Sequence, residues 1–190
     1  ALELGYSPND IVNDEQITVN LPGSKSWIPK NYSNTFSGEV TLTKALSESL
    51  NIPAVKISEA VGRISVSELG KKFGLLSDPT NGPAIALGTS EATLLDLVGA
   101  YATILNHGTK VEPFGWEKLQ LKKNKNETLM AKSEKPNMRI VKQETAEDLI
   151  FMMSEVTKNG TGKRAKFPDW EVAGKTGTSQ SARDAWFIGF

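Results

Sequence analysis

The sequence predicts an α+β fold, with a mainly helical part at residues 41–107 and a mainly sheet part, with one long helix, at residues 108–190. Through the first part, apolar residues recur at spacings of three and four, as on one face of a helix. After Gly108, short runs alternate between apolar and polar residues, as in strands, on either side of a helical pattern. Residues 1–190 are of a length that fits one domain, or the larger part of one.

The helical part contains four expected helices, whose ends have physical reasons. Proline suits the first position of a helix because that N–H has no partner inside the helix, serine caps helix starts, and glycine ends helices. Residues 77–89 are rich in proline and glycine and form a linker before the last helix. The helices are expected at Thr41–Leu50, from Pro53 to Gly62, from Ser65 or Ser67 to Gly74, and at 91–106.

Two of the predicted helices have a clear apolar side, because their apolar residues recur at helical spacing. On the helix at 91–106 the predicted buried side comprises Leu94, Leu95, Leu97, Val98, Tyr101, Ile104 and Leu105. On a helix predicted at Gln143–Lys158 it comprises Leu149, Ile150, Met152, Met153 and Val156.

The strands are predicted from alternating patterns between turn residues. Residues 6–40 are rich in Pro, Asn, Ser and Gly and are expected to form an extended surface with one short strand at Gln16–Asn20. Ala1–Leu4 has the pattern of the last turn of a helix that Gly5 ends. The other strands are expected at Trp116–Lys122, Glu127–Ala131, Met138–Val141, Glu171–Ser179 and Asp184–Phe190, with Gln180–Arg183 joining the last two.

Composition excludes several classes of protein. The 22 basic residues balance 22 acidic residues, whereas a nucleic-acid-binding domain is strongly basic, so we expect no nucleic-acid partner. The chain has no cysteine and one histidine, His107. A zinc site would therefore need carboxylates for nearly all its ligands, and we expect no metal. His107 is expected at the surface, at a helix end. No stretch approaches the ~20 apolar residues of a membrane span.

The run Lys175-Thr176-Gly177-Thr178 places polar groups on a predicted strand. Lys175 offers a fixed positive charge to a substrate carboxylate. The hydroxyls of Thr176 and Thr178 lie on one face, because side chains alternate along a strand. Gly177 lets a ligand backbone lie close to the strand. A plain exposed strand with a solvated lysine is an equally good interpretation of these residues alone.

The same residues also suggest the end of a phosphate-binding loop. That motif requires a glycine five residues before Gly174, and Asp169 stands there instead. The flanking Trp170 is also unsuited to a loop whose backbone wraps a phosphate. Nucleotide binding is therefore the weakest hypothesis, and it requires that Lys175 does not lie on a strand facing Ser49.

A Ser-x-Asn motif occurs twice, at Ser7-Pro8-Asn9 and at Ser49-Leu50-Asn51. The first is typical of a turn. The second ends the helix predicted at Thr41–Leu50, where asparagine is also a natural cap, so a structural role is a reasonable alternative. The motif alone does not define a site.

The order of the motifs along the chain is more informative than any one of them. Four segments over about residues 32–190 resemble, in family order, the transpeptidase domain of class A penicillin-binding proteins, which are bifunctional peptidoglycan glycosyltransferases and transpeptidases. The segments are Thr41–Lys56, Ala86–Glu91, Gly160–Ala165 with Ala173–Ser179, and Asp184–Phe190.

The resemblance implies the penicillin-binding, serine β-lactamase-like fold in two subdomains, truncated here at both ends, and a D-alanyl-D-alanine transpeptidase. Such an enzyme cross-links peptidoglycan stem peptides by serine acyl transfer and is acylated by β-lactams. No cofactor is implied. The resemblance also implies a parent protein with an upstream membrane anchor and glycosyltransferase domain, on the periplasmic or extracytoplasmic face of the bacterial cytoplasmic membrane.

The resemblance also implies roles for individual residues. Ser49 corresponds to the hydroxyl that relays a proton to the leaving amine, and Asn51 to the amide that holds the substrate's peptide backbone. Lys175 is expected against Ser49, where it stabilises developing negative charge. The implied substrate-binding residues are Thr176, Gly177 and Thr178.

The nucleophile of this family is a serine in a Ser-x-x-Lys motif, and no serine of this chain has a lysine three residues later. The simplest expectation is that this serine lies shortly before Ala1 and that the chain alone is inactive. The alternative is a non-catalytic module of the same fold that binds muropeptides or a partner. Without the family's serine-bearing helix, we expect an exposed apolar groove.

Overall fold

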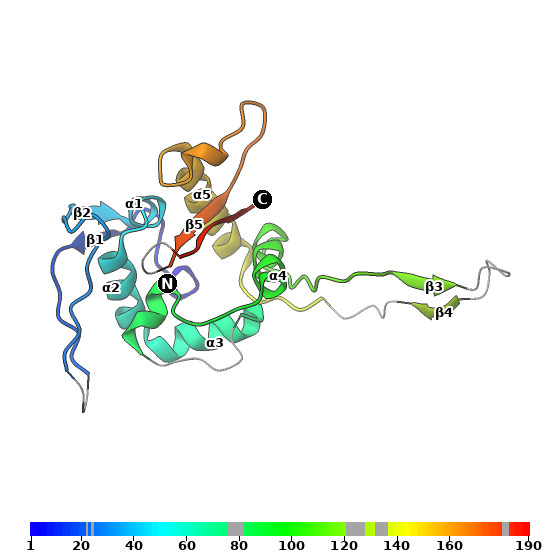
Figure 1. Ribbon diagram of the computed structural model, residues 1–190, viewed down its shortest axis with the longest axis horizontal. Coiled ribbons are helices and arrows are strands. Elements are labelled where there is room, and N and C mark those ends of the chain that lie inside the picture. Colours follow the sequence, from blue (N-terminus) through cyan, green and yellow to red (C-terminus); the bar gives the residue numbers. More distant parts are fainter. Residues whose placement is uncertain (22, 24, 76–81, 121–127, 132–136, 180–182) are drawn as a thin grey trace.

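The computed structural model combines helices with small antiparallel sheets (Figure 1), and the α+β prediction is confirmed. The structure describes residues 1–21, 23, 25–75, 82–120, 128–131, 137–179 and 183–190. Its helices are η1 (Leu2–Leu4), α1 (Leu42–Ser47), α2 (Asn51–Val61), α3 (Arg63–Phe73), η2 (Pro83–Leu87), α4 (Leu94–Leu105), α5 (Gln143–Lys158) and η3 (Lys163–Ala165), where η marks a 3-10 helix. Its strands are β1 (Ile11–Asp14), β2 (Gly38–Thr41), β3 (Lys118–Gln120), β4 (Thr128–Ala131), β5 (Gly174–Thr178) and β6 (Ala185–Gly189), paired in that order as three antiparallel two-stranded sheets.

The first sheet corrects the prediction for the N-terminal region. The strand expected at Gln16–Asn20 is wrong, because only Val19 makes a bridge there, with Trp27. Strand β1 lies earlier in the chain and pairs with β2, so that Val12 is opposite Val40. Both valines are buried. Their burial fixes the register, since a shift by one residue would turn both side chains to solvent.

The first predicted helix is interrupted where the Ser-x-Asn motif lies. Ser49 has a φ of 57°, in the left-handed region, so α1 ends at Ser47 instead of continuing to Leu50. Helix α2 begins at Asn51, two residues before the proline that was expected to start it. Asn51 therefore opens a helix rather than ending one. Proline is tolerated there because the first backbone N–H groups of a helix have no intrahelical partner.

The third helix also starts differently from the prediction. Helix α3 follows directly on Gly62, without a serine cap, and Ser67 is buried within it. Gly74 closes the helix in the left-handed conformation, as predicted. Part of the predicted linker lies outside the described residues, and Pro83–Leu87 of the linker forms η2.

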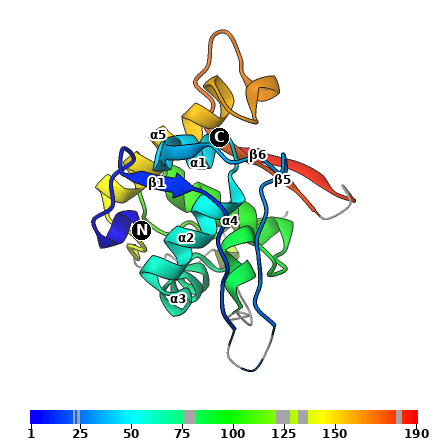
Figure 2. The ribbon, with the colours of Figure 1, turned by 90° about the vertical axis from the view of Figure 1, so that its left-hand side faces the viewer.

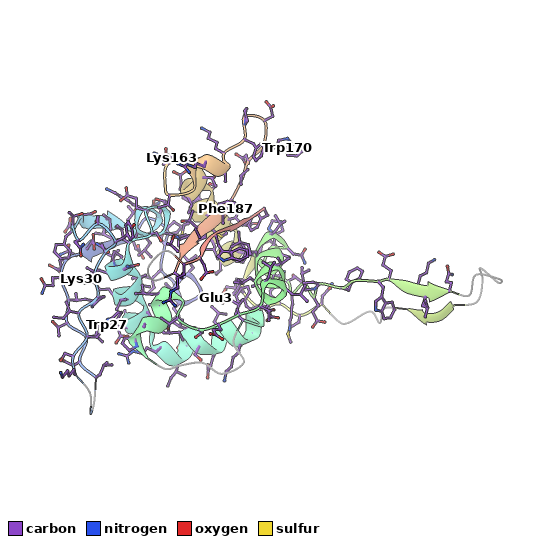
Figure 3. All side chains as sticks on the ribbon, in the orientation of Figure 1. Glu3, Trp27, Lys30, Lys163, Trp170 and Phe187 are labelled. Carbon is purple, nitrogen blue, oxygen red and sulfur yellow. The ribbon has the colours of Figure 1, made fainter. Side chains whose placement is uncertain are left out.

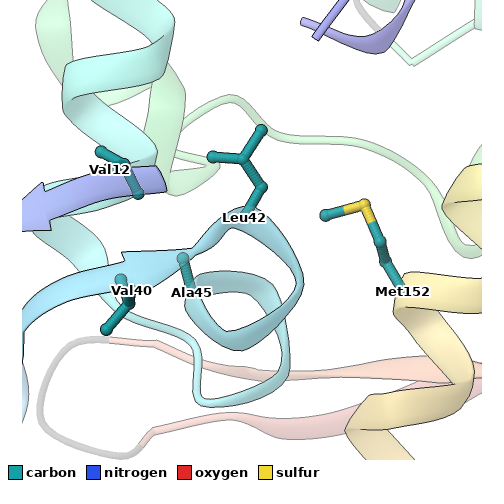
Figure 4. Packing of buried hydrophobic residues seen from close by; sticks show 5 residues of the cluster. All are labelled: Val12, Val40, Leu42, Ala45 and Met152. Atoms are coloured by element: carbon teal, nitrogen blue, oxygen red, sulfur yellow. The ribbon is translucent and has the colours of Figure 1, made fainter. Parts of the chain in front are cut away.

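Helix α5 has the predicted bounds and joins the two parts of the chain. Its Met152 packs in a cluster with residues of β1, β2 and α1, and Figure 4 shows this cluster of Val12, Val40, Leu42, Ala45 and Met152. The neighbouring Met153 packs with Ile104 of α4 and Ala173 before β5. Figure 2 shows β5 and β6 extending past α1 toward one side of the molecule. The core therefore contains residues from both sides of residue 108.

The predicted buried side of α4 is wrong in part. Leu94, Leu95, Val98 and Leu105 are 57%, 62%, 45% and 51% exposed. The buried residues of α4 lie on the other face and are mostly small: Gly99, Ala100, Thr103 and Ile104. A Cβ on Gly99 would come within 3.1 Å of Pro113, so the small residues permit close packing. The helix is apolar on both faces, and its spacing alone does not indicate which face is buried.

The remaining strand predictions are mostly confirmed, with shorter bounds. Strands β3 and β4 lie within two of the predicted runs, pair antiparallel and form an arm that projects from the helices (Figure 1). Residues 121–127 between them lie outside the described residues. Strands β5 and β6 lie within the predicted runs and pair antiparallel. The strand at Met138–Val141 is wrong, because only Arg139 makes a bridge, with Thr109.

The two faces of α4 can be compared with a matched pair of variants. Leu95→Gln replaces an exposed side chain and should change the unfolding free energy of the 190-residue chain by less than about 0.5 kcal/mol. Ile104→Gln places an amide in the core and should lower the unfolding free energy by about 2–5 kcal/mol. Urea denaturation followed by circular dichroism measures both, and similar losses would contradict the assignment of faces.

Candidate active site

Strand β5 is held against β6 by close packing around one aromatic ring. A Cβ on Gly174 would lie 2.5 Å from Phe187 Cζ, and one on Gly189 would lie 2.9 Å from the same atom. Both positions therefore require glycine for the ring of Phe187, labelled in Figure 3, to lie across the strand ends. The packing fixes the register that places Lys175 opposite Ile188.

The hydrogen-bond pattern leaves one edge of β5 facing away from β6. Ala173 and Phe190 exchange both backbone hydrogen bonds, and the N–H of Ser179 donates to the carbonyl of Asp184. Because hydrogen-bonded pairs alternate along an antiparallel ladder, the backbone groups of Thr176 and Thr178 point away from β6. An extended peptide could pair with this edge by adding a strand.

Lys175 contacts the break between α1 and α2. Its Nζ donates a hydrogen bond to Ser49 Oγ at 2.7 Å and another to the carbonyl of Thr176 at 3.0 Å. Lys175 is partly buried and Ser49 is exposed. Burial lowers the pKa of the Lys175 ammonium from its ordinary value, because the charged form loses solvation. The Ser49 oxygen accepts this hydrogen bond, so the serine's own O–H remains available to donate a hydrogen bond to another group.

The turn after α5 holds these two elements together. The N–H of Thr161 donates to the carbonyl of Ser47, at the end of α1, at 3.0 Å. A Cβ on Gly160 would lie 2.1 Å from the same carbonyl oxygen, so only glycine allows this approach. Thr161 Oγ1 also lies 2.6 Å from Thr176 Oγ1 on β5. One turn therefore contacts α1 and β5 at the same time.

Asn51 is held at the start of α2 by the segment before β2. Its side-chain Nδ2 donates to the carbonyl of Lys30 at 2.8 Å, and its backbone N–H donates to Asn31 Oδ1 at 3.0 Å. The structure thus brings Ser49, Asn51 and Lys175 to one region. Sequence reasoning missed Asn31, because it acts through partners far away in the chain. It singled out Gly160–Ala165 after α5 as a family segment, but not the contacts that this turn makes with α1 and β5.

The other candidate residues take no part in this arrangement. Ser7-Pro8-Asn9 forms a turn in which the Asn9 N–H donates to Ser7 Oγ. His107 follows α4 at the surface, with Nδ1 3.5 Å from Glu147 Oε1. Within the described residues, no group of three or more His, Cys, Asp or Glu side chains is placed to hold a metal ion. Among those same residues, no helix is long and apolar enough to cross a bilayer.

The geometry does not support a phosphate-binding loop. Such a loop leads into the N-terminus of a helix, whose N–H groups bind the phosphate. Gly174-Lys175-Thr176 lies instead within β5, which leads to β6. Because Lys175 faces Ser49 from a strand, the condition that would favour nucleotide binding is not met.

Comparisons with known proteins identify the family of this chain. A family model described as the penicillin binding protein transpeptidase domain matches residues 1–190. The chain is 34% identical over 211 residues to penicillin-binding protein 1A of Rickettsia conorii, covering 100% of the chain and 27% of that protein. It is 32% identical over 184 residues to penicillin-binding protein 1B of Haemophilus influenzae, covering 95% of the chain and 23% of that protein.

A solved structure extends the similarity to three dimensions. The crystal structure of penicillin-binding protein 1A from Haemophilus influenzae matches with a TM-score of 0.90 at 25% identity, covering 100% of this chain and 34% of that chain. The chain belongs to the penicillin-binding protein transpeptidase domain family. Its relatives are penicillin-binding proteins 1A and 1B, so the resemblance to the class A proteins is confirmed. The chain spans 27% of the length of the first of these relatives.

The lowered pKa of Lys175 predicts how stability depends on pH. Between this lowered value and the ordinary lysine pKa of about 10.4, the unfolded chain binds more protons than the folded chain. The unfolding free energy of the wild type, relative to Lys175→Met, should therefore rise with pH through this window. Below the lowered pKa the burial penalty is present in full. Urea unfolding of both chains at several pH values measures this difference, and a flat difference would contradict the burial effect.

Proposed function

We propose that this chain forms part of a D-alanyl-D-alanine transpeptidase domain that cross-links peptidoglycan stem peptides by serine acyl transfer. The observation that carries the proposal is the 2.7 Å hydrogen bond from Lys175 Nζ to Ser49 Oγ. It joins the Lys-Thr-Gly strand to the Ser-x-Asn motif across 126 residues of sequence. Both motifs lie within residues 1–190, which the transpeptidase family model matches, and this supports the proposal.

Ser49 and Lys175 transfer protons and stabilise charge in the proposed mechanism. A lysine with a lowered pKa exchanges protons more readily near neutral pH than an ordinary lysine. Ser49 passes its own proton to the amine that leaves the donor peptide, and at the same time takes a proton from Lys175, which donates a hydrogen bond to it. When Lys175 is protonated, its positive charge stabilises the negative charge that develops on the substrate.

The edge of β5 and Asn51 bind the substrate in this proposal. The donor peptide lies along the edge of β5 that faces away from β6, and its backbone is held by Asn51. The N–H of Thr178 supplies half of the oxyanion hole, because this group points away from β6. The hydroxyls of Thr176 and Thr178 bind the terminal carboxylate. Gly177 has open space beside its Cα and lets the peptide approach.

The nucleophile of the proposed reaction is not among these residues. No serine of the chain precedes a lysine by three positions, so we place the Ser-x-x-Lys serine in another segment of the intact protein. Its hydroxyl attacks the carbonyl of the penultimate D-Ala, and the terminal D-Ala leaves as the amine. An amine of a second stem peptide then attacks the acyl-enzyme and releases the serine. A β-lactam acylates the same serine.

The proposed setting of the intact protein is the one that the resemblance to class A penicillin-binding proteins implies. We place the domain on the periplasmic or extracytoplasmic face of the bacterial cytoplasmic membrane, in a protein that has a membrane anchor and a glycosyltransferase domain. The partners are peptidoglycan stem peptides and β-lactam antibiotics. A non-catalytic module that binds muropeptides or a partner is the alternative, and it differs from the enzyme in having no serine that a penicillin acylates.

The first prediction concerns the nucleophile. The 190-residue chain alone should not be labelled covalently by a fluorescent penicillin, whereas the intact protein should be, because only the intact protein contains the acylatable serine. Gel fluorescence after denaturation measures both. Stable labelling of the chain alone would place the nucleophile within it. An unlabelled but folded intact protein would favour the non-catalytic module.

The second prediction concerns Lys175 in the intact protein. Lys175→Ala removes the charge beside Ser49 and should lower the rate of acylation by a penicillin about a hundredfold or more. Lys72→Ala, at an exposed position on α3, is the matched control and should leave the rate unchanged. Stopped-flow or time-course labelling measures the rates. Equal rates for the two variants would show that Lys175 has no role in acylation.

A further inference from the structure

Asn31 is a buried amide in a segment without regular structure. Residues 28–37 form neither a helix nor a strand, and Tyr32 within this segment is 95% exposed. Asn31 itself is only 4% exposed. Burying an amide is unfavourable unless its polar atoms are hydrogen-bonded. The partners of Asn31 therefore indicate why its side chain is directed inward.

Both ends of the Asn31 amide are bonded to groups that fix its orientation. Its Nδ2 donates to Asp14 Oδ1 and Oδ2 at 2.8 and 2.9 Å, and to the carbonyl of Thr35 at 3.0 Å. Its Oδ1 accepts from the N–H groups of Asn51 and Ile52 at 3.0 and 3.2 Å. The carboxylate and the carbonyl only accept hydrogen bonds, and the N–H groups only donate. The amide therefore has one satisfactory orientation.

The two N–H groups are the first of α2 and have no partner inside the helix. Leu50, the residue before the helix, has no side-chain acceptor that could cap them. Asn31 supplies the cap from 20 residues earlier in the chain. The position of the first turn of α2 therefore depends on the position of Asn31.

Asp14 supports Asn31 from the end of β1. Its side chain is fully buried and also accepts from the N–H of Ser37 at 2.9 Å. Asp14 places a negative charge behind Asn31, on the side away from the positive end of α2. Its neighbours hold α2 as well, since Lys56 Nζ donates to the carbonyl of Asn13 at 2.7 Å and to Glu15 at 2.9 Å.

Asn51 is consequently fixed by two consecutive residues. Asn31 holds its backbone N–H, and the carbonyl of Lys30, labelled in Figure 3, holds its side-chain Nδ2 at 2.8 Å. Because the Lys30 carbonyl only accepts, the Nδ2 end of Asn51 faces Lys30. The Oδ1 end is directed elsewhere and can accept the N–H of a substrate backbone.

We propose that Asn31, supported by the carboxylate of Asp14, is the positioning residue that aligns Asn51 for substrate binding. The inference rests on the proposed function, in which Asn51 holds the substrate's backbone. Asn31 acts through Asn51. Its removal therefore weakens the complex that precedes acylation more than it slows the acylation step, because a backbone hydrogen bond is present in both the bound complex and the transition state.

The experiment is a double-mutant cycle in the intact protein, with acylation by a fluorescent penicillin as the reaction. Asn31→Asp exchanges the amide NH2 for an oxygen and places two carboxylates in contact. Asn31→Asp combined with Asp14→Asn restores a donor and an acceptor between these positions. Each variant is made with Asn51 intact and with Asn51→Ala. Asn9→Asp makes the same atomic change at an exposed turn and is the control.

We expect Asn31→Asp to raise the dissociation constant of the pre-acylation complex about tenfold to a hundredfold. The combined variant should recover part of this loss, because the carboxylate contact is relieved while the Thr35 carbonyl still lacks the hydrogen bond that Asn31 donates. In the Asn51→Ala background, Asn31→Asp should raise this dissociation constant less than about twofold, since the two changes act on one contact. A loss of folding alone would instead lower the fraction of protein that is labelled. Asp14→Asn is a milder variant and should follow the same pattern.

Three results would overturn the inference. Unchanged binding in Asn31→Asp would show that Asn31 positions nothing. If the factors by which Asn31→Asp and Asn51→Ala each raise the dissociation constant multiply in the double variant, Asn31 acts independently of Asn51. The role of Asn51 in the proposed function would then still stand. If Asn51→Ala leaves acylation unchanged, both the inference and the proposed role of Asn51 fail.

Discussion

The candidate site depends on the close backbone contact between the turn after α5 and the end of α1. The Ser47 carbonyl receives the N–H of Thr161, and a side chain larger than hydrogen at residue 160 would overlap it. The same turn contacts β5 through Thr176. Helix α5 also packs in both core clusters. The turn that follows it therefore fixes the elements that carry Ser49 and Lys175 relative to the core.

A second constraint is the burial of polar groups that cannot be left without partners. Asp14 and Asn31 satisfy each other and the start of α2, whereas Lys175 is only partly buried and donates to Ser49 and to its neighbour's carbonyl. The hydrogen bonds of Asp14 and Asn31 join buried groups of the fold to one another. The hydrogen bond of Lys175 keeps a charged group against an exposed serine, and the lowered pKa of Lys175 results from that incomplete solvation. Asn31 contacts the start of α2 at Asn51, and Lys175 contacts Ser49 in the break between α1 and α2.

Periodic patterns of apolar residues predicted the helices and strands whose sequence has one clear period. The bounds of α5 follow from a long helical period, and β5 and β6 from two neighbouring alternating runs. The break at Ser49 was not predicted, because a left-handed helix end usually carries glycine or asparagine rather than serine. Its backbone hydrogen bonds are local, from the Ser49 N–H to the Leu46 carbonyl and from the Leu50 N–H to the Ala45 carbonyl. The buried face of α4 was also missed. Both faces of this helix are apolar, and the segments that pack against it determine which face is buried. The motifs indicated Ser49, Asn51 and Lys175, and a family segment included Gly160 and Thr161, but Asn31 and Asp14 lie in no motif that the sequence revealed.

The outward face of α4 affects how this chain behaves in solution. Leu94, Leu95 and Val98 present contiguous hydrocarbon to water in the folded state. Dyes that fluoresce on apolar surfaces are commonly used to detect partly unfolded, molten states. Here such a dye has a binding surface on the native chain. Its fluorescence would therefore overstate unfolding, and loss of near-ultraviolet circular dichroism is the more faithful signal of lost packing.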